Sequence, residues 1–540
     1  MNTFPTRKPL AVGLFILFAY GLLIHLPYIH LKEFQGMEGI RVVVAQNMLK
    51  SGDWVVPSLE GSVYLKKPPL FNWILAGMFD LTGSVSEATS RSVSVLAALL
   101  AAMAISLLWQ RISQDQGIGF VVPGLIFLTF PDVIDKTIRG AEIDLTFALF
   151  VMLAMGSWFY LQEVRKRPAA AWIISLALMG FSFLIKGVQA PAFFYGGVLP
   201  YLVYKKQQRE IFSRWHVLGI AAALAVSAVW LLPLAHRMGL EKLLNEWWYQ
   251  IGKRAEPLEG SAATHLLTFP LEYVGAYLPW ILLLGLWRNR PLSGEPPIIQ
   301  RLAVFCLMSL LFSVPLYWVI PGARVRYVLP VSGMVAVLAF LPLRQIIAGK
   351  MESPRWLPLS LTVLGILMSL AALSAPLWGR KFGVFDRVAP PILLGGLLLS
   401  GVFLVSQRHA STGRRIAIVF LCLLFLRNAG ASLYLPYHAG HMSYYREAAA
   451  QINRLVPPET PLYNLNTWNL HITYYLNRPV IRILEFVPSE LPAGAVVYTT
   501  REVAERIPKE TLTVLGTIKA RRDVLIVYRV ERVSRPASGQ

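Results

Sequence analysis

Long apolar segments dominate the pattern of hydrophobic and polar positions along this chain. Thirteen of them are long enough to cross the roughly 30 Å hydrocarbon core of a bilayer. They begin near Leu10, Ser92, Gly117, Leu145, Ala170, Val188, His216, Pro270, Leu302, Tyr327, Leu357, Pro390 and Ile416. The pattern therefore predicts a polytopic α-helical membrane protein with about thirteen transmembrane helices.

Basic residues in the connecting segments predict how these helices are oriented across the membrane. Clusters recur at every second connection, and the positive-inside rule places them in the cytoplasm. They are Arg7/Lys8, Arg111, Arg165/Lys166/Arg167, Lys205/Lys206/Arg209, Arg288/Arg290, Arg344/Lys350/Arg355 and Arg408/Arg414/Arg415. The N-terminus is then cytoplasmic and the C-terminus external. We expect external loops at residues 30–90, 133–144 and 236–268.

Two segments in these loops have the pattern of helices at the membrane surface. Pro68–Leu81 is apolar but too short to span, which favours a helix lying in the outer interface. Met238–Arg254 carries apolar residues at helical spacing, which predicts an interfacial amphipathic helix. The Gly-, Ser- and charge-containing stretch Gly252–His265 predicts a mobile loop after it.

From about residue 437 the composition becomes that of a soluble domain. The spacing of apolar residues predicts a helix over Ser443–Leu455, and short β-branched runs predict strands at Val496–Thr500, Thr511–Gly516 and Val524–Val530. We therefore expect a transmembrane domain over residues 1–436 and a small external α/β domain over residues 437–540.

The overall composition excludes several other classes of protein. Of the 540 residues, 55% are hydrophobic and only 15% are charged, against about 25% charged in soluble domains. Intrinsic disorder, a coiled coil and an ordinary soluble enzyme do not fit these values. The net charge of +21 is explained mostly by cytoplasmic loops, so no nucleic-acid partner is expected. Cys306 and Cys422 lie in apolar stretches, which excludes a disulfide framework.

Acidic residues are scarce, and two of them stand at the same external face. Glu38 lies on the loop after the first span, and Asp144 opens the fourth span. A carboxylate at that depth is costly unless it is paired or functional. Two acids meeting there could share a general base role or hold a divalent cation. Alternatively, each acid pairs with a neighbouring arginine, such as Arg41 or Arg139.

Basic residues at the external face depart from the positive-inside pattern. They are Lys66, Lys67, Lys186, Lys253, Arg254, Arg324 and Arg326. Gathered beside two acids, these cations suit a phosphate or pyrophosphate group, which arginine binds through two bonds. Singly, each would be explained by attraction to anionic lipid headgroups, worth about 1 kcal/mol. As a set they favour a lipid-phosphate site.

Several of these residues belong to segments that resemble a known family. The stretch from Glu38-Gly39-Ile40-Arg41 through Asn47–Pro57 to Tyr64-Leu65-Lys66-Lys67-Pro68-Pro69 is similar to the first periplasmic loop of the bacterial lipid A 4-amino-4-deoxy-L-arabinose transferases. These are GT-C glycosyltransferases related to the protein O-mannosyltransferases. Arg139–Asp144 resembles the second acidic loop of that family, and Lys186-Gly187, Arg326–Pro330 and Tyr474–Pro479 resemble its later motifs.

The resemblance implies an inner-membrane enzyme that uses a polyprenyl-phosphate-linked sugar on the periplasmic face, with inversion at the anomeric carbon. It implies catalytic roles for Asp144 and Glu38 and donor-binding roles for Lys67, Tyr64, Lys186, Arg326, Arg139 and Arg324. The acceptor would be a lipid A-like lipid, a glycan or a protein. Met37 stands where the family has Asp, and Lys66 where it has Glu. No cofactor is implied beyond a divalent cation at Glu38 and Asp144.

Two other functions are compatible with the sequence. One is a lipid or solute transporter, in which polar groups and broken helices lie near the bilayer midplane, often in repeated halves. Here the charged residues gather at the outer boundary, and no repeat is visible. The other is a relative that binds polyprenyl lipid without turning it over.

Overall fold

The computed structural model describes residues 7–115, 118–138, 140–255, 262–289, 291–352, 356–409, 412–467, 470–508, 510–521 and 523–531. The chain forms two compact units. The first comprises Met1–Ile29, Lys66–Phe71 and Arg91–Tyr434, and the second comprises His30–Leu65, Asn72–Ser90 and Leu435–Gln540. The second unit therefore joins most of residues 30–90 to the C-terminal sheet domain. The division at residues 436 and 437 stays a prediction.

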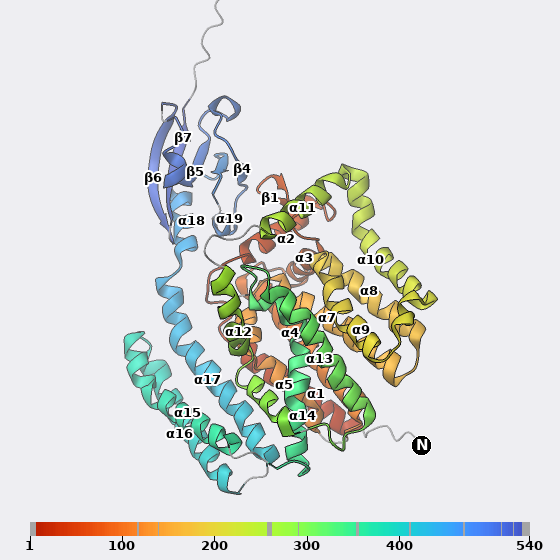
Figure 1. The fold of residues 1–540 in the computed structure, drawn as a ribbon. Helices are drawn as coiled ribbons and strands as arrows, with labels where there is room; N and C mark the ends of the chain where they lie inside the picture. Colours follow the sequence, from red (N-terminus) through yellow and green to blue (C-terminus); the bar gives the residue numbers. More distant parts are fainter. Residues whose placement is uncertain are drawn as a thin grey trace, which may run out of the picture. The chain divides into compact units, whose positions relative to one another are not determined.

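The first unit consists of helices (Figure 1). Its first half contains α1 (Arg7–His25), most of α4 (Glu87–Ser113), η1 (Ile118–Val121), α5 (Val122–Leu128), α6 (Pro131–Ile138), α7 (Ile143–Phe159), η2 (Tyr160–Val164), α8 (Pro168–Lys186), α9 (Gln189–Tyr204), η3 (Gln208–Phe212) and α10 (Arg214–Met238). Its second half contains α11 (Glu241–Ala255), α12 (Ala262–Ala276), η4 (Trp280–Asn289), α13 (Pro297–Trp318), η5 (Val325–Val331), α14 (Ser332–Ile347), α15 (Trp356–Lys381), α16 (Phe385–His409) and most of α17 (Thr412–His441).

These helices confirm a polytopic helical membrane protein. Among the described residues, eight helical spans are long and apolar enough to cross a membrane, or nine if the bent pair α12 and η4 is one span. Shorter apolar helices include Pro9–His25, Gly119–Leu128 and Arg387–Phe403. Segments such as the 16-residue α9 fall short of a full crossing by length alone. The number thirteen therefore stays a prediction.

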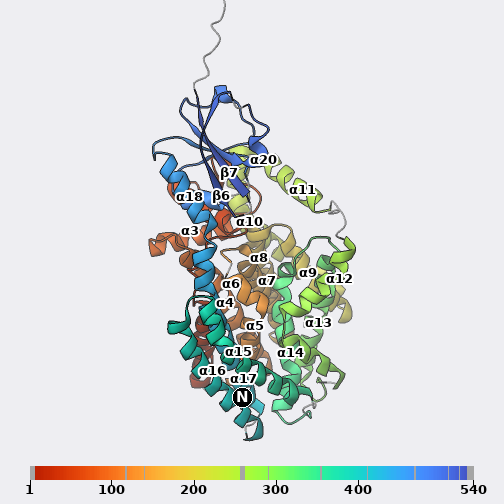
Figure 2. The same cartoon turned by 90° about the vertical axis from the view of Figure 1, so that its left-hand side faces the viewer.

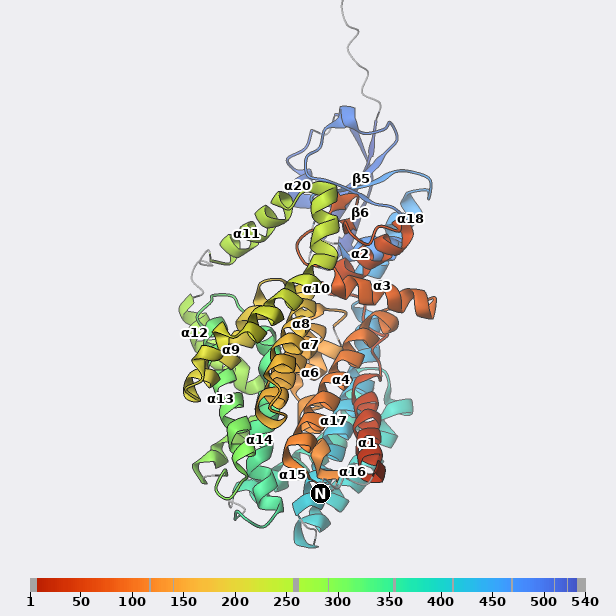
Figure 3. The same ribbon diagram turned by 90° about the vertical axis from the view of Figure 1, so that its right-hand side faces the viewer.

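Small residues let neighbouring helices of this unit approach closely. Helix α8 packs against α7 and α10, side by side in Figure 3. A Cβ atom on Gly180 of α8 would lie 2.8 Å from the carbonyl oxygen of Ala223, and one on Gly219 of α10 would lie 2.7 Å from that of Trp172. Such contacts between small residues are a common way for membrane helices to associate. They fix the position of α8, which ends at Lys186.

Both segments predicted as surface helices are helical, and their position at a membrane surface stays a prediction. Pro68–Leu81 corresponds to α3 (Leu70–Thr82), and Met238–Arg254 corresponds to α11. The ring of Trp247 on α11 packs edge-on against Phe183 of α8, with ring centres 5.8 Å apart. The amphipathic helix therefore lies against the end of α8. Residues 256–261 of the predicted mobile loop lie outside the described residues.

The second unit contains a five-stranded mixed sheet, whose strands are visible in Figure 2. The strand order is β4-β3-β5-β7-β6, parallel from β4 to β5 and antiparallel from β5 to β6. The strands are β3 (Leu462–Leu465), β4 (Ile481–Ile483), β5 (Val496–Thr500), β6 (Leu512–Ala520) and β7 (Asp523–Val530). Helices α18 (Tyr444–Leu455), α19 (His471–Leu476) and α20 (Arg501–Ala504) and η6 (Pro488–Glu490) complete this part. The predicted α/β domain is thus confirmed.

Most of residues 30–90, the segment predicted to be external, belongs to the same unit. It contains α2 (Glu38–Ser51), the hairpin β1 (Ser58–Leu59) and β2 (Ser62–Val63), and most of α3. Glu60 lies at the turn of this hairpin and is almost completely buried. Its carboxylate accepts hydrogen bonds from the side-chain nitrogen of Asn464, at 2.9 Å, and from the hydroxyl of Thr473. This carboxylate therefore ties residues 58–63 to the sheet domain.

Replacing Glu60 with alanine should destabilise the second unit. Each of the two hydrogen bonds contributes about 0.5–1.5 kcal/mol when the carboxyl is neutral, so Glu60→Ala should lower the free energy of unfolding by at least about 1 kcal/mol at low pH. Burial raises the pKa of the Glu60 carboxyl. Its contribution to stability is therefore fully present below the pKa of the unfolded chain and declines as pH rises through the folded pKa. Thermal unfolding of purified protein between pH 4 and 8 measures both effects, and exposed Glu490→Ala is the control.

Candidate active site

Asp144 lies in the first turn of α7 and is 4% exposed. The N-terminus of a helix carries a partial positive charge that favours an ionised carboxylate. Asp144 therefore stands at the start of a helix, where the sequence placed it. Because α7 is also one of the candidate membrane spans, the carboxylate stands at the end of a transmembrane helix.

Two cations from distant parts of the first unit face this carboxylate. The Nζ of Lys186, the last residue of α8, lies 2.5 Å from Oδ1 of Asp144. The Nε of Arg326, on η5, lies 3.7 Å from Oδ2. Arg326 also donates from Nη1 to Oε2 of Glu142 at 2.6 Å. Two acids and two bases thus form one buried cluster.

Aromatic rings shield the cluster from water. The Nζ of Lys186 lies 5.0 Å from the centre of the Phe147 ring and 5.2 Å from that of Tyr327. Only 5% of the Lys186 side chain and 16% of the Arg326 side chain are exposed. An ion pair in such surroundings has lost its hydration, so removing one partner leaves a costly buried charge.

The backbone around the cluster has room for glycine alone. A Cβ atom on Gly140 would lie 1.6 Å from the carbonyl oxygen of Lys136, and the hydroxyl of Ser94 on α4 donates to the Gly140 carbonyl. Gly187, which ends α8, has φ +68°, a conformation that L side chains rarely adopt. These geometries explain in physical terms why glycine stands two residues before Glu142 and directly after Lys186.

The other predicted catalytic residue, Glu38, lies in the second unit. The sequence placed it on a loop, but it is the first residue of α2, because Gly36 and Met37 turn the chain before it. Its side chain is fully buried and accepts a hydrogen bond from the backbone nitrogen of Gln35 at 3.0 Å. The carboxylate therefore closes the turn that starts this helix.

The remaining predicted donor-binding residues have different environments. Lys67, in the first unit, is half-buried, and Arg324 is exposed. Tyr64, in the second unit, is buried with its ring 5.6 Å from the Arg41 guanidinium, and no hydrogen-bond partner is seen for its hydroxyl. Arg139 lies outside the described residues. The suggested pairing of Asp144 with Arg139 is therefore untested, whereas its pairing with Lys186 and Arg326 is observed.

Sequence reasoning passed over three residues of this site as functional candidates. Glu142 was seen only as part of a motif, although its spacing from Asp144 was a signal that both side chains could meet one cation. Tyr327 follows Arg326 and contacts Lys186. Asp132 lies directly before the loop expected at residues 133–144, in the helix α6 (Pro131–Ile138) that extends into that loop. Nothing in its local pattern marked Asp132.

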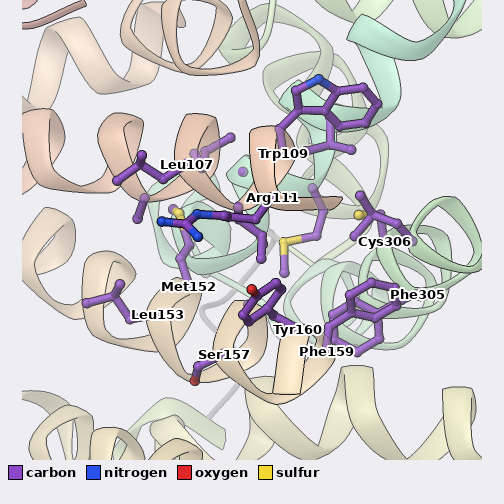
Figure 4. Close-up of a pocket in the computed structure, with 18 residues that line it drawn as sticks. Leu107, Trp109, Arg111, Met152, Leu153, Ser157, Phe159, Tyr160, Phe305 and Cys306 are labelled. Carbon is purple, nitrogen blue, oxygen red and sulfur yellow. The ribbon is translucent and has the colours of Figure 1, made fainter. Parts of the chain in front are cut away.

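Two cavities in the first unit are apolar and contain none of these acids. One, of about 330 Å³, is lined by α4, α7, η2, α13 and α14, and Arg111 is the charged residue among those lining it (Figure 4). Its lining on α7 begins at Met152, eight residues beyond Asp144, or about 12 Å along the helix. The other, of about 350 Å³, lies between α8, α9 and α10. Both suit hydrocarbon rather than polar chemistry.

The residues around Asp144 do not fit a divalent cation. Both of its carboxylate oxygens face protein cations, which already supply the charge that a metal would bring. Across the described parts of the chain, three or more His, Cys, Asp or Glu side chains nowhere gather as metal ligands would.

Comparisons with known proteins agree with this architecture. Residues 66–232 match the model of the family described as dolichyl-phosphate-mannose-protein mannosyltransferase. The undecaprenyl phosphate-alpha-4-amino-4-deoxy-L-arabinose arabinosyl transferase of Edwardsiella ictaluri is 30% identical over 302 residues, covering 55% of this chain and 52% of the relative. A transferase of that name from Sodalis glossinidius is 27% identical over 405 residues, covering 71% and 68%. The chain thus spans about half the length of some of the curated relatives it matches.

A solved structure extends the similarity to the whole fold. ArnT from Cupriavidus metallidurans, in its crystal structure bound to undecaprenyl phosphate, superposes with a TM-score of 0.73 at 18% identity. The superposition covers 96% of this chain and 98% of ArnT. The resemblance expected from the sequence is therefore confirmed: the chain has the fold of ArnT and is similar in sequence to the aminoarabinose and protein mannosyl transferases.

Proposed function

We propose that this protein is an inner-membrane glycosyltransferase that moves a sugar from undecaprenyl phosphate, or a similar polyprenyl phosphate, to an envelope lipid, glycan or protein. The N-terminus would be cytoplasmic, and the sheet domain and the reaction would be periplasmic. The similarity to named transferases supports the reaction class. The buried cluster of Asp144, Lys186 and Arg326 is the observation that carries the proposal.

The chemistry requires stabilisation of opposite charges at two places. As the bond to the leaving phosphate breaks, the anomeric carbon becomes oxocarbenium-like and the phosphate gains negative charge. Fixed charges aimed at such positions lower the barrier because they need no reorganisation. Asp144 is suited to the positive carbon. Lys186 and Arg326 lie next to Asp144, and their positive charges suit the leaving phosphate.

Lys67 and Tyr64 would bind the donor phosphate from the first external segment. Lys67 precedes the rigid Pro68-Pro69 pair, and Tyr64 keeps a buried hydroxyl that lacks a hydrogen-bond partner. Arg324 and Arg139 would add positive charge near this phosphate. A buried polar group without a partner is costly, so a ligand oxygen at Tyr64 would relieve that cost.

The activity is testable with donor lipid in membranes. Vesicles containing the overproduced protein should transfer label from radiolabelled undecaprenyl-phosphate sugars to an endogenous acceptor, with release of undecaprenyl phosphate. Vesicles without the protein are the control. A transporter would move the donor across the bilayer without consuming it, and a non-catalytic relative would bind it without sugar release. Either result would overturn the enzymatic proposal, and neither alternative is favoured by the similarities found.

A further inference from the structure

Asp132 is a half-buried acid close to the Asp144 cluster, and the proposed sugar transfer does not use it. It is the second residue of α6, twelve residues before Asp144. Its Oδ2 atom is buried, and no hydrogen-bond partner is seen for it in the structure. Leaving such an atom without a partner costs about 1–3 kcal/mol. An atom of this kind near a reaction site is a candidate for contact with substrate.

Charged and titratable groups face Asp132 from several elements. On α6 itself these are Lys136 and Asp135, on α7 Asp144, and on η5 Arg326. After α12 stands Tyr277, whose ring packs edge-on against Phe130, with centres 4.8 Å apart. On α1, His25 is hydrogen-bonded to Thr137 of α6 at 2.8 Å. The groups that face Asp132 are Lys136, Asp135, Asp144, Arg326 and Tyr277. His25 contacts Thr137 on the same helix.

Tyr277 supplies a second group of the same kind as Asp132. Its hydroxyl is buried, and no hydrogen-bond partner is seen for it. The charge of Asp132 acts on this phenol, so the two side chains are close enough to interact electrostatically. The carboxyl and the phenol each have hydrogen-bonding capacity that no protein group uses in the structure, so together they could hydrogen-bond to a hydroxyl group of a substrate.

Asp132 is better suited than Asp144 to take up a proton. Both oxygens of Asp144 face cations, so its lone pairs are already engaged. Burial raises the pKa of the Asp132 carboxyl to about 6. General bases are most effective when their pKa lies near the working pH. Asp144 is therefore suited to provide a fixed negative charge, and Asp132 is suited to take up a proton.

We propose that Asp132 is the general base, and hence that the acceptor reacts through a hydroxyl group. The hydroxyl oxygen forms a bond to the anomeric carbon, and the bond from that carbon to the donor phosphate breaks. The bonding electrons leave on the polyprenyl phosphate, and the hydroxyl proton passes to Asp132. This inference rests on the proposed glycosyl transfer and adds the acceptor class to it.

The pH profile of transfer tests the assignment. Wild-type protein in membrane vesicles, which supply the acceptor, is given a series of radiolabelled undecaprenyl-phosphate sugars, beginning with the aminoarabinose donor. The rate should rise with pH up to about 6 and then level off, because the base must be unprotonated. Asp132→Asn should lower the rate about a hundredfold and abolish this rise, whereas Asp132→Glu should keep a rise with a shifted midpoint.

Asp135→Asn is the matched control. Asp135 lies on the same helix and pairs with Lys136 at 2.9 Å, so this variant makes the same chemical change beside the site. It should keep the rate and the rise with pH, with the midpoint moved slightly to lower pH because the charge of Asp135 helps to raise the pKa of Asp132. A wild-type profile that is flat below pH 7, or an Asp132→Asn profile with the wild-type rise, would overturn the inference while leaving glycosyl transfer intact. If Asp132→Asn fails to fold, an unshifted midpoint in Asp132→Glu overturns it instead. Absence of any transfer by wild type would count against the proposed function itself.

Discussion

Purified Asp144→Asn protein should transfer sugar at least about a hundredfold more slowly than wild type. The amide keeps nearly the same shape but removes the negative charge that we assign to the anomeric carbon. Loss of one fixed electrostatic group at a transition state typically costs a hundred- to a thousandfold in turnover. Donor binding should be largely retained, because Lys186 and Arg326 keep their positive charges. Turnover and donor KM, measured separately, show this division.

Asp115→Asn is a matched control for that experiment. Asp115 is also paired with an arginine, Arg344, at 3.0 Å, but it lies two residues after the C-terminal end of α4 and outside the Asp144 cluster. The same substitution there also breaks an ion pair without touching the proposed site, and turnover should stay within about threefold of wild type, as for most changes away from such sites. Near-normal transfer by Asp144→Asn would make Asp144 an ion-pair partner of Lys186 and Arg326 and nothing more. Glu38→Gln should be impaired less, because its carboxylate holds a turn.

Elements with a long, regular pattern could be predicted from the sequence. The helix expected over Ser443–Leu455 is α18, and the strand expected over Val496–Thr500 is β5 with the same bounds. In α18 the apolar period extends over enough residues to be distinctive, and in β5 a run of β-branched residues marks the strand. Strands β3 and β4 were missed because their four and three residues carry too little pattern. Their pairing joins residues far apart in the sequence, and local preference does not encode that.

The site was predicted as separate residues but not as an arrangement. Asp144, Lys186 and Arg326 each stood out as charges at the external ends of apolar segments. Lys186 bonds to Asp144 across 42 residues of sequence, and Arg326 bonds to Glu142 across 184 residues. No local sequence pattern indicated either contact. These contacts depend on how α7, α8 and η5 pack. The sequence treated both cations as phosphate ligands, whereas the structure also gives each an acidic partner.

Lys67 is the cation whose proposed role in donor binding rests most on local geometry. It is half-buried and is followed by the buried Pro68 and Pro69, whose rings restrict the backbone. A lysine side chain that starts from a fixed backbone loses less freedom when it binds a phosphate. Lys66, beside it, is also half-buried and carries the same charge. The two lysines therefore form a natural pair for comparison.

Lys67→Ala should weaken donor binding about ten- to a hundredfold, the cost of losing one charge-assisted contact of about 1.5–3 kcal/mol. Expression and the melting temperature should be unchanged, because the side chain is half-exposed. Lys66→Ala removes an equal charge and should change donor binding less than threefold if the effect is specific rather than a general attraction of about 1 kcal/mol per cation to anionic lipid. Competition between labelled donor and undecaprenyl phosphate on purified protein measures both affinities. Equal losses in the two variants would favour general attraction, and an unchanged affinity in Lys67→Ala would remove Lys67 from the donor site.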